Sequence, residues 1–357
     1  MANAVLAPIS RVRWTATGLP DGCTINQSSG VIGGTPTTIG DYTVNLTAEN
    51  NWGTATSSLV IHVKEPPTRY AVRRDGVELI RLTLADLKKR VADRTLEETF
   101  RIGDQLILPW TDPYTDTEYE CPLNFGTFRN FTLEDDSLAY GLGLQTEYAV
   151  PPSGYIEFDH KESNSADSGC QSYGNSRWSV SNIRQWLNAK GTPWYSAQHE
   201  ADAEPISSYK YHKGFMDTFP ADFIDILTPV KNVTQVSSDD NGGGLDTTFD
   251  TFFLLSTHEV FSNPSNRALS DDTEGAYWEI WKKKTGLDDY QVGEWTTNAN
   301  GAYNNKKIEN HSSNTSVWLR NVWNDTTWKV WTMTDTGYFQ GTYPSSTCRV
   351  TPACAVC

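Results

Sequence analysis

The residues of this chain best suited to chemistry are its six cysteines and six histidines, types that ligate metals and act as nucleophiles or bases. Cys354 and Cys357 have the C-x-x-C spacing of a redox pair or of half a zinc site. A redox pair usually lies at a helix start, and zinc needs a second pair of ligands, which the nearby sequence does not supply. We therefore expect buried thiols in a terminal strand. A metal site remains the alternative.

The histidines do not form the His-Glu-x-x-His or His-x-x-x-His patterns of metal sites. His258 lies within Ser256-x-x-Glu259, a helix-capping pattern, and is predicted to lie on a helix surface. Adjacent acids are predicted to be solvated turns rather than catalytic pairs, because neighbouring side chains point in different directions. These pairs are Glu97-Glu98, Asp135-Asp136, Asp239-Asp240 and Asp271-Asp272. The sequence therefore predicts that the protein is not an enzyme.

One loop has a distant likeness to a calcium-binding loop. Asp239, Asn241, Gly244 and Asp250 stand at its positions one, three, six and twelve. The fifth position is Gly243, which has no side chain to ligate the ion, and no pair of helices brackets the loop. We interpret the pattern as a chance match and predict that no cofactor is bound, with calcium left open as the alternative.

The last segment, Ser316 to Cys357, crowds aromatic and polar side chains together, as contact surfaces do. Trp318 and Leu319 are expected in the core, and Arg320 is expected in a structural salt bridge. Trp328 and Trp331 are three residues apart, which puts them on opposite faces of an extended strand. The predicted ligand-binding residues are Asn321, Trp323, Asn324, Asp325, Thr327, Trp328, Tyr338, Gln340, Thr342 and Tyr343.

Composition excludes several classes of partner. The net charge of the 357 residues is −15, so nucleic acid is not an expected partner, because affinity for it depends on Lys and Arg. No apolar run approaches the roughly 20 residues that span a bilayer, so membrane insertion is not expected. The opening Met1 to Pro8 lacks the charged leader and long apolar core of a signal peptide. The 13 Trp and 16 Tyr suit sugar or protein contact, although a β-rich core also needs aromatics.

The elements that must position these residues begin with a small β unit over 1–65. Apolar residues alternate with polar ones from Tyr42 to Ala48 and again from Leu59 to Val63, which predicts a hairpin of half-buried strands. Gly- and Pro-rich turns between short strands favour a β-sandwich. Residues 66–99 are predicted to be a linker followed by a connector helix capped by Thr83 and Asp86. The piece from about 70 to 98 could instead be the opening of the large domain.

The rest of the chain, 100–357, is predicted to be one α+β domain. Arg101 to Pro109 is expected to be its first strand, and Phe252 to Leu255 a buried strand. Either Ser179 or Ser181 is expected to cap one helix, and Pro220 to begin another. Strands and helices mix here without a βαβ rhythm. The fold class is therefore mainly β plus α+β.

Two stretches resemble known families. The first 65 residues resemble bacterial and phage immunoglobulin-like modules through Gly18-Leu-Pro-Asp-Gly, Gly30-Val-Ile-Gly-Gly-Thr-Pro and Gly40-Asp-Tyr-Thr-Val. The rest resembles a domain of phage and gut-bacterial proteins with a C-type-lectin-like fold, some of whose relatives are variable proteins of diversity-generating retroelements. That resemblance rests on Trp318-Leu-Arg, Gly337-Tyr338, the Arg349 to Cys357 ending, and upstream motifs such as Pro109-Trp-Thr-Asp and Ser181-Asn-Ile-Arg-Gln-Trp-Leu-Asn.

The resemblance implies that the first and last strands of the large domain pair, and that the variable-type segment 316–357 presents a ligand face. It implies a phage tail receptor-binding protein or a bacterial surface adhesin that contacts a host cell-surface protein or glycan. Tail proteins are commonly trimers, so a homotrimer is the oligomer to test. Two features depart from the family. The Glu-Pro-Asn and Gln-Pro-Asp tripeptides of calcium lectins are absent, and adenine mutagenesis of Asn codons does not give Trp323, Trp328, Lys329 or Gln340.

Two alternatives remain open from the sequence. The first is an enzyme of the formylglycine-generating type or a sugar hydrolase, because a related fold houses such enzymes. The second is a purely structural virion protein.

Overall fold

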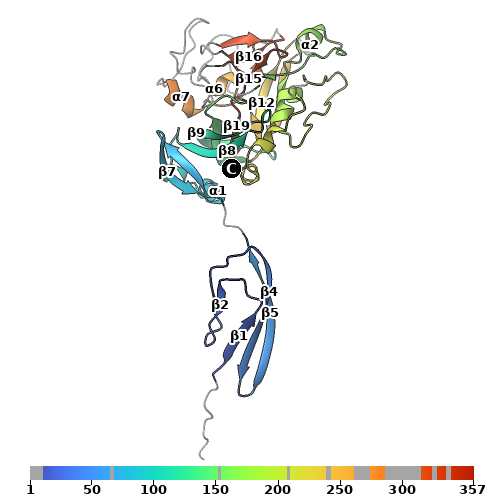
Figure 1. Cartoon of the computed structure of the whole chain (residues 1–357). Helices are drawn as coiled ribbons and strands as arrows, with labels where there is room; N and C mark the ends of the chain where they lie inside the picture. Colours follow the sequence, from blue (N-terminus) through green and yellow to red (C-terminus); the bar gives the residue numbers. More distant parts are fainter. Residues whose placement is uncertain are drawn as a thin grey trace, which may run out of the picture. The chain divides into compact units, whose positions relative to one another are not determined.

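A computed structural model of the chain divides it into two compact units, Met1–Thr68 and Arg69–Cys357 (Figure 1). Strands dominate both, which confirms the predicted class of mainly β plus α+β. In the part of the chain that the structure describes, no helix is long and apolar enough to cross a membrane. The described residues are 11–64, 68–151, 154–206, 210–238, 243–260, 274–285, 315–323, 328–334 and 339–357.

The first unit is a small pair of sheets. One has the strand order β1-β4-β5 and the other is the hairpin β2-β3. The predicted alternation is present in β4, where Val44 is fully buried and its neighbours Thr43 and Asn45 are exposed. The strands are β1 (Arg13–Thr17), β2 (Cys23–Ile25), β3 (Ile32–Gly34), β4 (Gly40–Asn50) and β5 (Gly53–Val63).

A seven-stranded sheet organises the second unit, in the order β14-β19-β10-β9-β8-β6-β7. Large apolar side chains such as Leu106, Leu123, Phe125 and Leu144 line its buried surface. The strands are β6 (Tyr70–Arg74), β7 (Val77–Leu82), β8 (Gln105–Thr111), β9 (Glu118–Thr132), β10 (Leu138–Thr146), β14 (Phe252–Phe253) and β19 (Ala353–Val356).

The structure decides one open expectation about this sheet and contradicts another. The piece from about 70 to 98 opens the large domain and is not a separate connector, because β6 pairs with both β7 and β8 and so belongs to the sheet. The strand expected to be first, now β8, does not pair with the last strand. β9 and β10 form a long hairpin between them, so β19 pairs with β10 and β14 instead.

Three helices begin where the sequence predicts. Thr83 and Asp86 form the capping box of α1 (Leu84–Ala92), whose Leu84, Leu87 and Val91 face the core. Of the two candidate caps, Ser181 is the one that caps α3 (Asn182–Leu187), and Pro220 precedes α5 (Ala221–Ile224). The other helices among the described residues are α2 (Ser168–Tyr173), α6 (Thr257–Val260), α7 (Glu279–Thr285) and the 3-10 turns η1 (Leu96–Glu98), η2 (Trp178–Val180) and η3 (Phe215–Thr218).

Among the described residues of the second unit, three small sheets accompany the large one. Among them, β15-β16-β17 carries the segment predicted to bind a ligand. Trp318 and Leu319 of β15 are buried as expected. The strands are β11 (Ile156–Glu157) with β18 (Thr347–Cys348), β12 (Val230–Val236) with β13 (Gly244–Asp250), and β15 (Val317–Val322), β16 (Val330–Met333) and β17 (Phe339–Thr342).

Candidate functional site

Five side chains gather at one end of the β15-β16-β17 sheet, and we call this group the aromatic face: Tyr173, Trp323, Trp328, Lys329 and Tyr343. The strand register explains the meeting of three of them. Val322 pairs with Val330, and Val330 pairs with Thr342. The next residues outward on the three strands are therefore Trp323, Lys329 and Tyr343, which must lie side by side.

Ring contacts hold the aromatic face together. Tyr173 stacks on Tyr343, with ring centroids 4.0 Å apart and planes 12° from parallel. The Lys329 ammonium lies 5.0 Å from the Tyr343 centroid and 5.2 Å from the Trp323 centroid. Trp323 meets Trp331 edge to face at 6.2 Å. Tyr173 and Tyr343 each keep 37% of their surface exposed, so the stack is open to solvent.

Two glycines let the indoles sit directly against backbone. A methyl group on Gly169 of α2 would overlap the Trp328 ring, and one on Gly341 of β17 would overlap the Trp323 ring. Neither glycine needs a left-handed backbone conformation, so close approach is the physical reason for the small residue. The positions of both indoles are therefore fixed by packing.

Nine of the ten predicted site residues fall into three groups. Gln340 is exposed and Thr342 is half-buried on β17, where Thr332 shares a hydroxyl contact of 2.6 Å with Thr342. Trp323, Trp328 and Tyr343 belong to the aromatic face. The remaining positions, Asn324, Asp325, Thr327 and Tyr338, lie outside the described residues.

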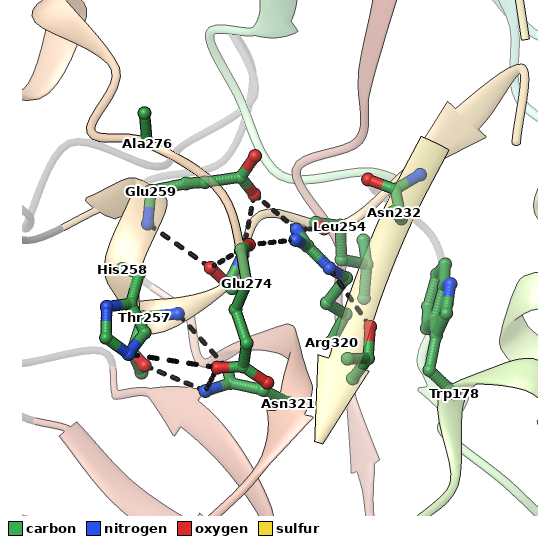
Figure 2. A network of polar contacts seen from close by, with 12 residues as sticks. Trp178, Asn232, Leu254, Thr257, His258, Glu259, Glu274, Ala276, Arg320 and Asn321 are labelled. Carbon is green, nitrogen blue, oxygen red and sulfur yellow. Dashed lines mark hydrogen bonds and ion pairs between the residues drawn. The ribbon is translucent and has the colours of Figure 1, made fainter. Parts of the chain in front are cut away.

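Asn321 is placed differently from the prediction, because it is only 1% exposed. Its side-chain oxygen accepts from the Thr257 backbone N–H at 3.1 Å. Its amide nitrogen donates to the Thr257 hydroxyl at 2.8 Å and to the Glu274 carboxylate at 3.0 Å. All six residues of β15 are buried, so a polar side chain on this strand meets partners inside the protein and not a ligand outside (Figure 2).

Arg320 is the centre of this buried network, as Figure 2 shows. Its guanidinium donates to Glu259, to the carbonyls of Leu254 and Glu274, and to the Thr234 hydroxyl. The predicted structural salt bridge is confirmed. The pairing satisfies a buried charge that would otherwise be very costly.

His258 does not lie on a helix surface. It is buried, and its Nε2 lies 4.0 Å from the Glu274 carboxylate. The capping box itself is present, since Ser256 N–H donates to the Glu259 carboxylate and Glu259 N–H donates to the Ser256 hydroxyl. The sequence located the helix start correctly but gave no sign that β15 and residue 274 enclose the helix.

Buried acids form a second cluster that sequence reasoning missed. Asp159 accepts from the backbone N–H groups of Asn175 at 2.9 Å and Asn182 at 3.0 Å. Glu162 pairs with His199 at 3.1 Å. Burial raises the pKa of Asp159 well above its usual range and also raises the pKa of Glu162. These contacts organise the loops around α2 and α3.

The cysteines are free thiols rather than disulfides. Cys354 is buried in β19 and Cys357 follows it half-buried. Burial raises the pKa of Cys121 and Cys348 to about 12 and that of Cys357 to about 11, so these thiols stay protonated at neutral pH.

Metal-ligating groups do not converge within the described ranges, where no cluster of three or more His, Cys, Asp or Glu could hold an ion. In the suspected calcium loop, Asp239 and Asn241 lie outside the described residues. Asp250 is fully buried and accepts from Arg184, Trp178, Asn232 and Thr248. Its oxygens are therefore occupied by the protein.

Tyr173 and Lys329 belong to the aromatic face but were not among the predicted site residues. Lys329 follows Trp328 within the segment predicted to form the contact surface, so the sequence alone could have placed it among the site residues. Tyr173 comes from α2, far from the last strands in sequence. Only the fold brings it to Tyr343, through the neighbouring bond from Ser345 N–H to the Tyr173 carbonyl at 2.8 Å.

Comparisons with known proteins give two family matches. The model of "Domain of unknown function (DUF6273)" matches residues 145–357, more than half of the chain. The model of "Putative Ig domain" matches residues 5–64, which agrees with the immunoglobulin-like resemblance of the first unit. None of the curated proteins matches this chain.

A solved structure that is similar to part of the chain is that of a putative alpha-galactosidase from Bacteroides fragilis NCTC 9343. The similarity has 31% identity over 25% of this chain, with a TM-score of 0.15. This chain covers 19% of that protein. A likeness of this extent carries no argument about fold or activity.

Proposed function

We propose, on the premise that this chain belongs to the DUF6273 family of domains of unknown function, that it is a recognition protein whose second unit binds its target through the aromatic face. The Ig-like domain at its N-terminus suggests a binding or surface role. In this proposal the first unit is a spacer and the second carries the contact surface.

The open stack of Tyr173 on Tyr343, with Lys329 beside it, is the observation that carries the proposal. Exposed tyrosines offer a flat apolar surface with a polar rim, which suits the apolar face of a sugar or a partner's side chain. Lys329 adds a cation that is held between two rings, so it loses little freedom when a ligand contacts it. The indoles beneath are fixed by Gly169 and Gly341.

The proposed setting is a phage tail or a bacterial cell surface, with a host cell-surface protein or glycan as the partner. A C-type-lectin-like fold for the second unit and diversification by a retroelement are finer parts of the same proposal. In this proposal the protein binds its target as a homotrimer, and it neither catalyses a reaction nor needs a metal. Two observations support this setting. The chain carries an Ig-like unit, and the aromatic face of its second unit lies at the ends of neighbouring strands.

A glycan array and a bacterial cell-binding assay with the full chain test this proposal. Tyr343→Ala and Tyr173→Ala should each lower binding by about tenfold, the loss of one aromatic anchor worth about 1.4 kcal/mol. Tyr211→Ala is the matched control, because Tyr211 is 60% exposed and its ring contact is with Lys210. If Tyr343→Ala and Tyr173→Ala fold normally and bind like the unaltered protein, the aromatic face is not the contact surface.

A further inference from the structure

A pocket of about 250 Å³ is bordered by the buried Arg320 network, and no residue of the aromatic face lines it. β9 supplies Arg129 and Asn130 to its lining, and β12 supplies Lys231 and Asn232. Glu259 and Arg320 also line it. Since a water molecule occupies roughly 30 Å³ of liquid, the space equals that of about eight waters and suits a ligand of monosaccharide size.

The charges around the pocket do not balance. The Glu259 carboxylate receives both the Arg129 guanidinium, at 3.2 Å, and the Arg320 guanidinium. Two buried or half-buried cations therefore share one anion. Lys231 adds a third cation, whose ion pair at 2.6 Å is with Asp136, a side chain 72% exposed. Ion pairs with an exposed partner contribute little free energy, so the Lys231 ammonium can leave Asp136 and contact a ligand with little loss of stability.

Glu274 does not restore the balance. It meets Arg320 through its backbone carbonyl and not its carboxylate. Its carboxylate instead receives the Gln235 backbone N–H at 2.7 Å and the Asn321 amide at 3.0 Å. Burial raises the pKa of Glu274, while the Gln235 N–H, the Arg320 charge and the Asn321 amide act against that rise. Even with Glu259 and Glu274 both charged, the lining holds three cations, Arg129, Lys231 and Arg320, against two anions. The pocket thus carries a surplus positive charge in a chain whose net charge is −15.

Two strand edges border the same pocket. Over Arg129 to Thr132, β9 pairs with β10 alone, and β12 pairs with β13 alone, within the described residues. Each strand therefore presents one edge, whose N–H and C=O groups can bond hydroxyls. Surplus positive charge together with such groups suits a molecule that carries both a carboxylate and several hydroxyls.

We propose that this pocket binds a carboxylate-bearing monosaccharide, with Arg129 and Lys231 contacting the carboxylate and the edges of β9 and β12 contacting the hydroxyls. The arginine fork matches a carboxylate better than a lysine does. The site shares no residue with the aromatic face and does not depend on the function proposed for it.

Calorimetric titration of the full chain tests the proposal, with D-glucuronate and N-acetylneuraminate as probes and D-glucose as the neutral comparison. At least one acidic sugar should bind at least tenfold more tightly than glucose, and its affinity should fall as salt is raised. Lys231→Met should weaken that binding about tenfold. Lys213→Met is the matched control, because Lys213 makes the same kind of 2.6 Å surface pair with Asp116 and should leave affinity unchanged.

Arg129→Lys keeps the charge but loses the fork, so it should weaken the acidic sugar more than Lys231→Met does. The Arg129 guanidinium also donates to the Ala276 carbonyl at 2.6 Å and to Glu259 at 3.2 Å. The stability of the Arg129→Lys variant must therefore be checked by urea unfolding, and Lys231→Met remains the decisive variant if Arg129→Lys is unstable. The proposal would be overturned if neither acidic sugar bound more tightly than glucose, or if Lys231→Met kept full affinity for the acidic sugar that binds. Tyr343→Ala should leave the affinity for that acidic sugar unchanged, which separates this site from the aromatic face.

Discussion

Asn321 and Trp323 are two residues apart, yet they lie in opposite environments. Asn321 lies on β15, which is covered on both faces, and its amide is fully engaged with Thr257 and Glu274. Trp323 follows the last residue of β15, where the strand leaves that cover, and it joins the half-exposed aromatic face. Both looked like contact residues in the sequence. Position along the strand, rather than residue type, therefore decides which side chains a partner can reach.

The two regions should also respond differently to substitution. The network around Arg320 is a set of buried groups joined by hydrogen bonds, so removing Arg320 leaves several of them without their donor. The aromatic face is partly solvated, so truncating its outer members removes contact area while leaving no buried charge alone. Removing the central arginine of the network should therefore cost more stability than any substitution in the aromatic face.

Arg320→Met should destabilise the second unit by about 3–5 kcal/mol, because Glu259 and the carbonyls of Leu254 and Glu274 would all lose a buried donor. Urea unfolding followed by tryptophan fluorescence measures this loss. Arg81→Met is the matched control: its pair with Glu78 is exposed and should be worth at most about 1 kcal/mol. Similar losses in the two variants would show that the Arg320 network does not act as a buried unit.

Gly169→Ala should cost about 1–3 kcal/mol, because the added methyl overlaps the Trp328 indole and overpacks the site. It should also shift tryptophan fluorescence and weaken target binding. A double-mutant cycle with Trp328→Ala identifies the cause, since the methyl should cost clearly less once the indole is gone. Additive losses in that cycle would mean that the two residues do not meet.

Asp159→Asn should flatten the pH dependence of stability. Because the pKa of Asp159 is raised in the folded protein, the folded state holds a proton that the unfolded state has lost. Its contribution is fully present below the ordinary value of 3.8 and is lost as pH rises through the folded pKa. One proton gives a slope of up to about 1.4 kcal/mol per pH unit.

The measurement for Asp159→Asn is the free energy of unfolding at pH values from 4 upward. The unaltered protein should lose stability across this range through Asp159, and the variant should lose less. Glu162 and Glu274 add to the fall in both proteins, because burial raises their pKa in the same direction. An identical slope in the variant would exclude Asp159 as a source.

Lys329→Met should have the smallest effect on stability, about 0.5–1 kcal/mol, because it removes cation–π contacts at a half-exposed site. Thermal unfolding by circular dichroism measures this change. Binding of the target should fall more than stability does if the cation contacts a ligand. A loss of several kcal/mol would place Lys329 with the buried network instead of the aromatic face.

Much of the local structure could be predicted from the sequence. The alternation of β4, the capping box of Thr83 and Asp86, the Ser181 cap and the burial of Trp318 are all confirmed. The first three depend on neighbours within a few residues, through the period of the side chains or through a hydrogen bond to the adjacent backbone.

Only the tertiary structure decided how those pieces combine. The burial of Asn321 and His258, the stack of Tyr173 on Tyr343, and the pairing of β19 with β10 all join segments that lie far apart in the chain. A polar or aromatic residue type fits both a buried network and an exposed surface. The free energy of burial depends on which partners the fold supplies, and the local sequence does not contain them.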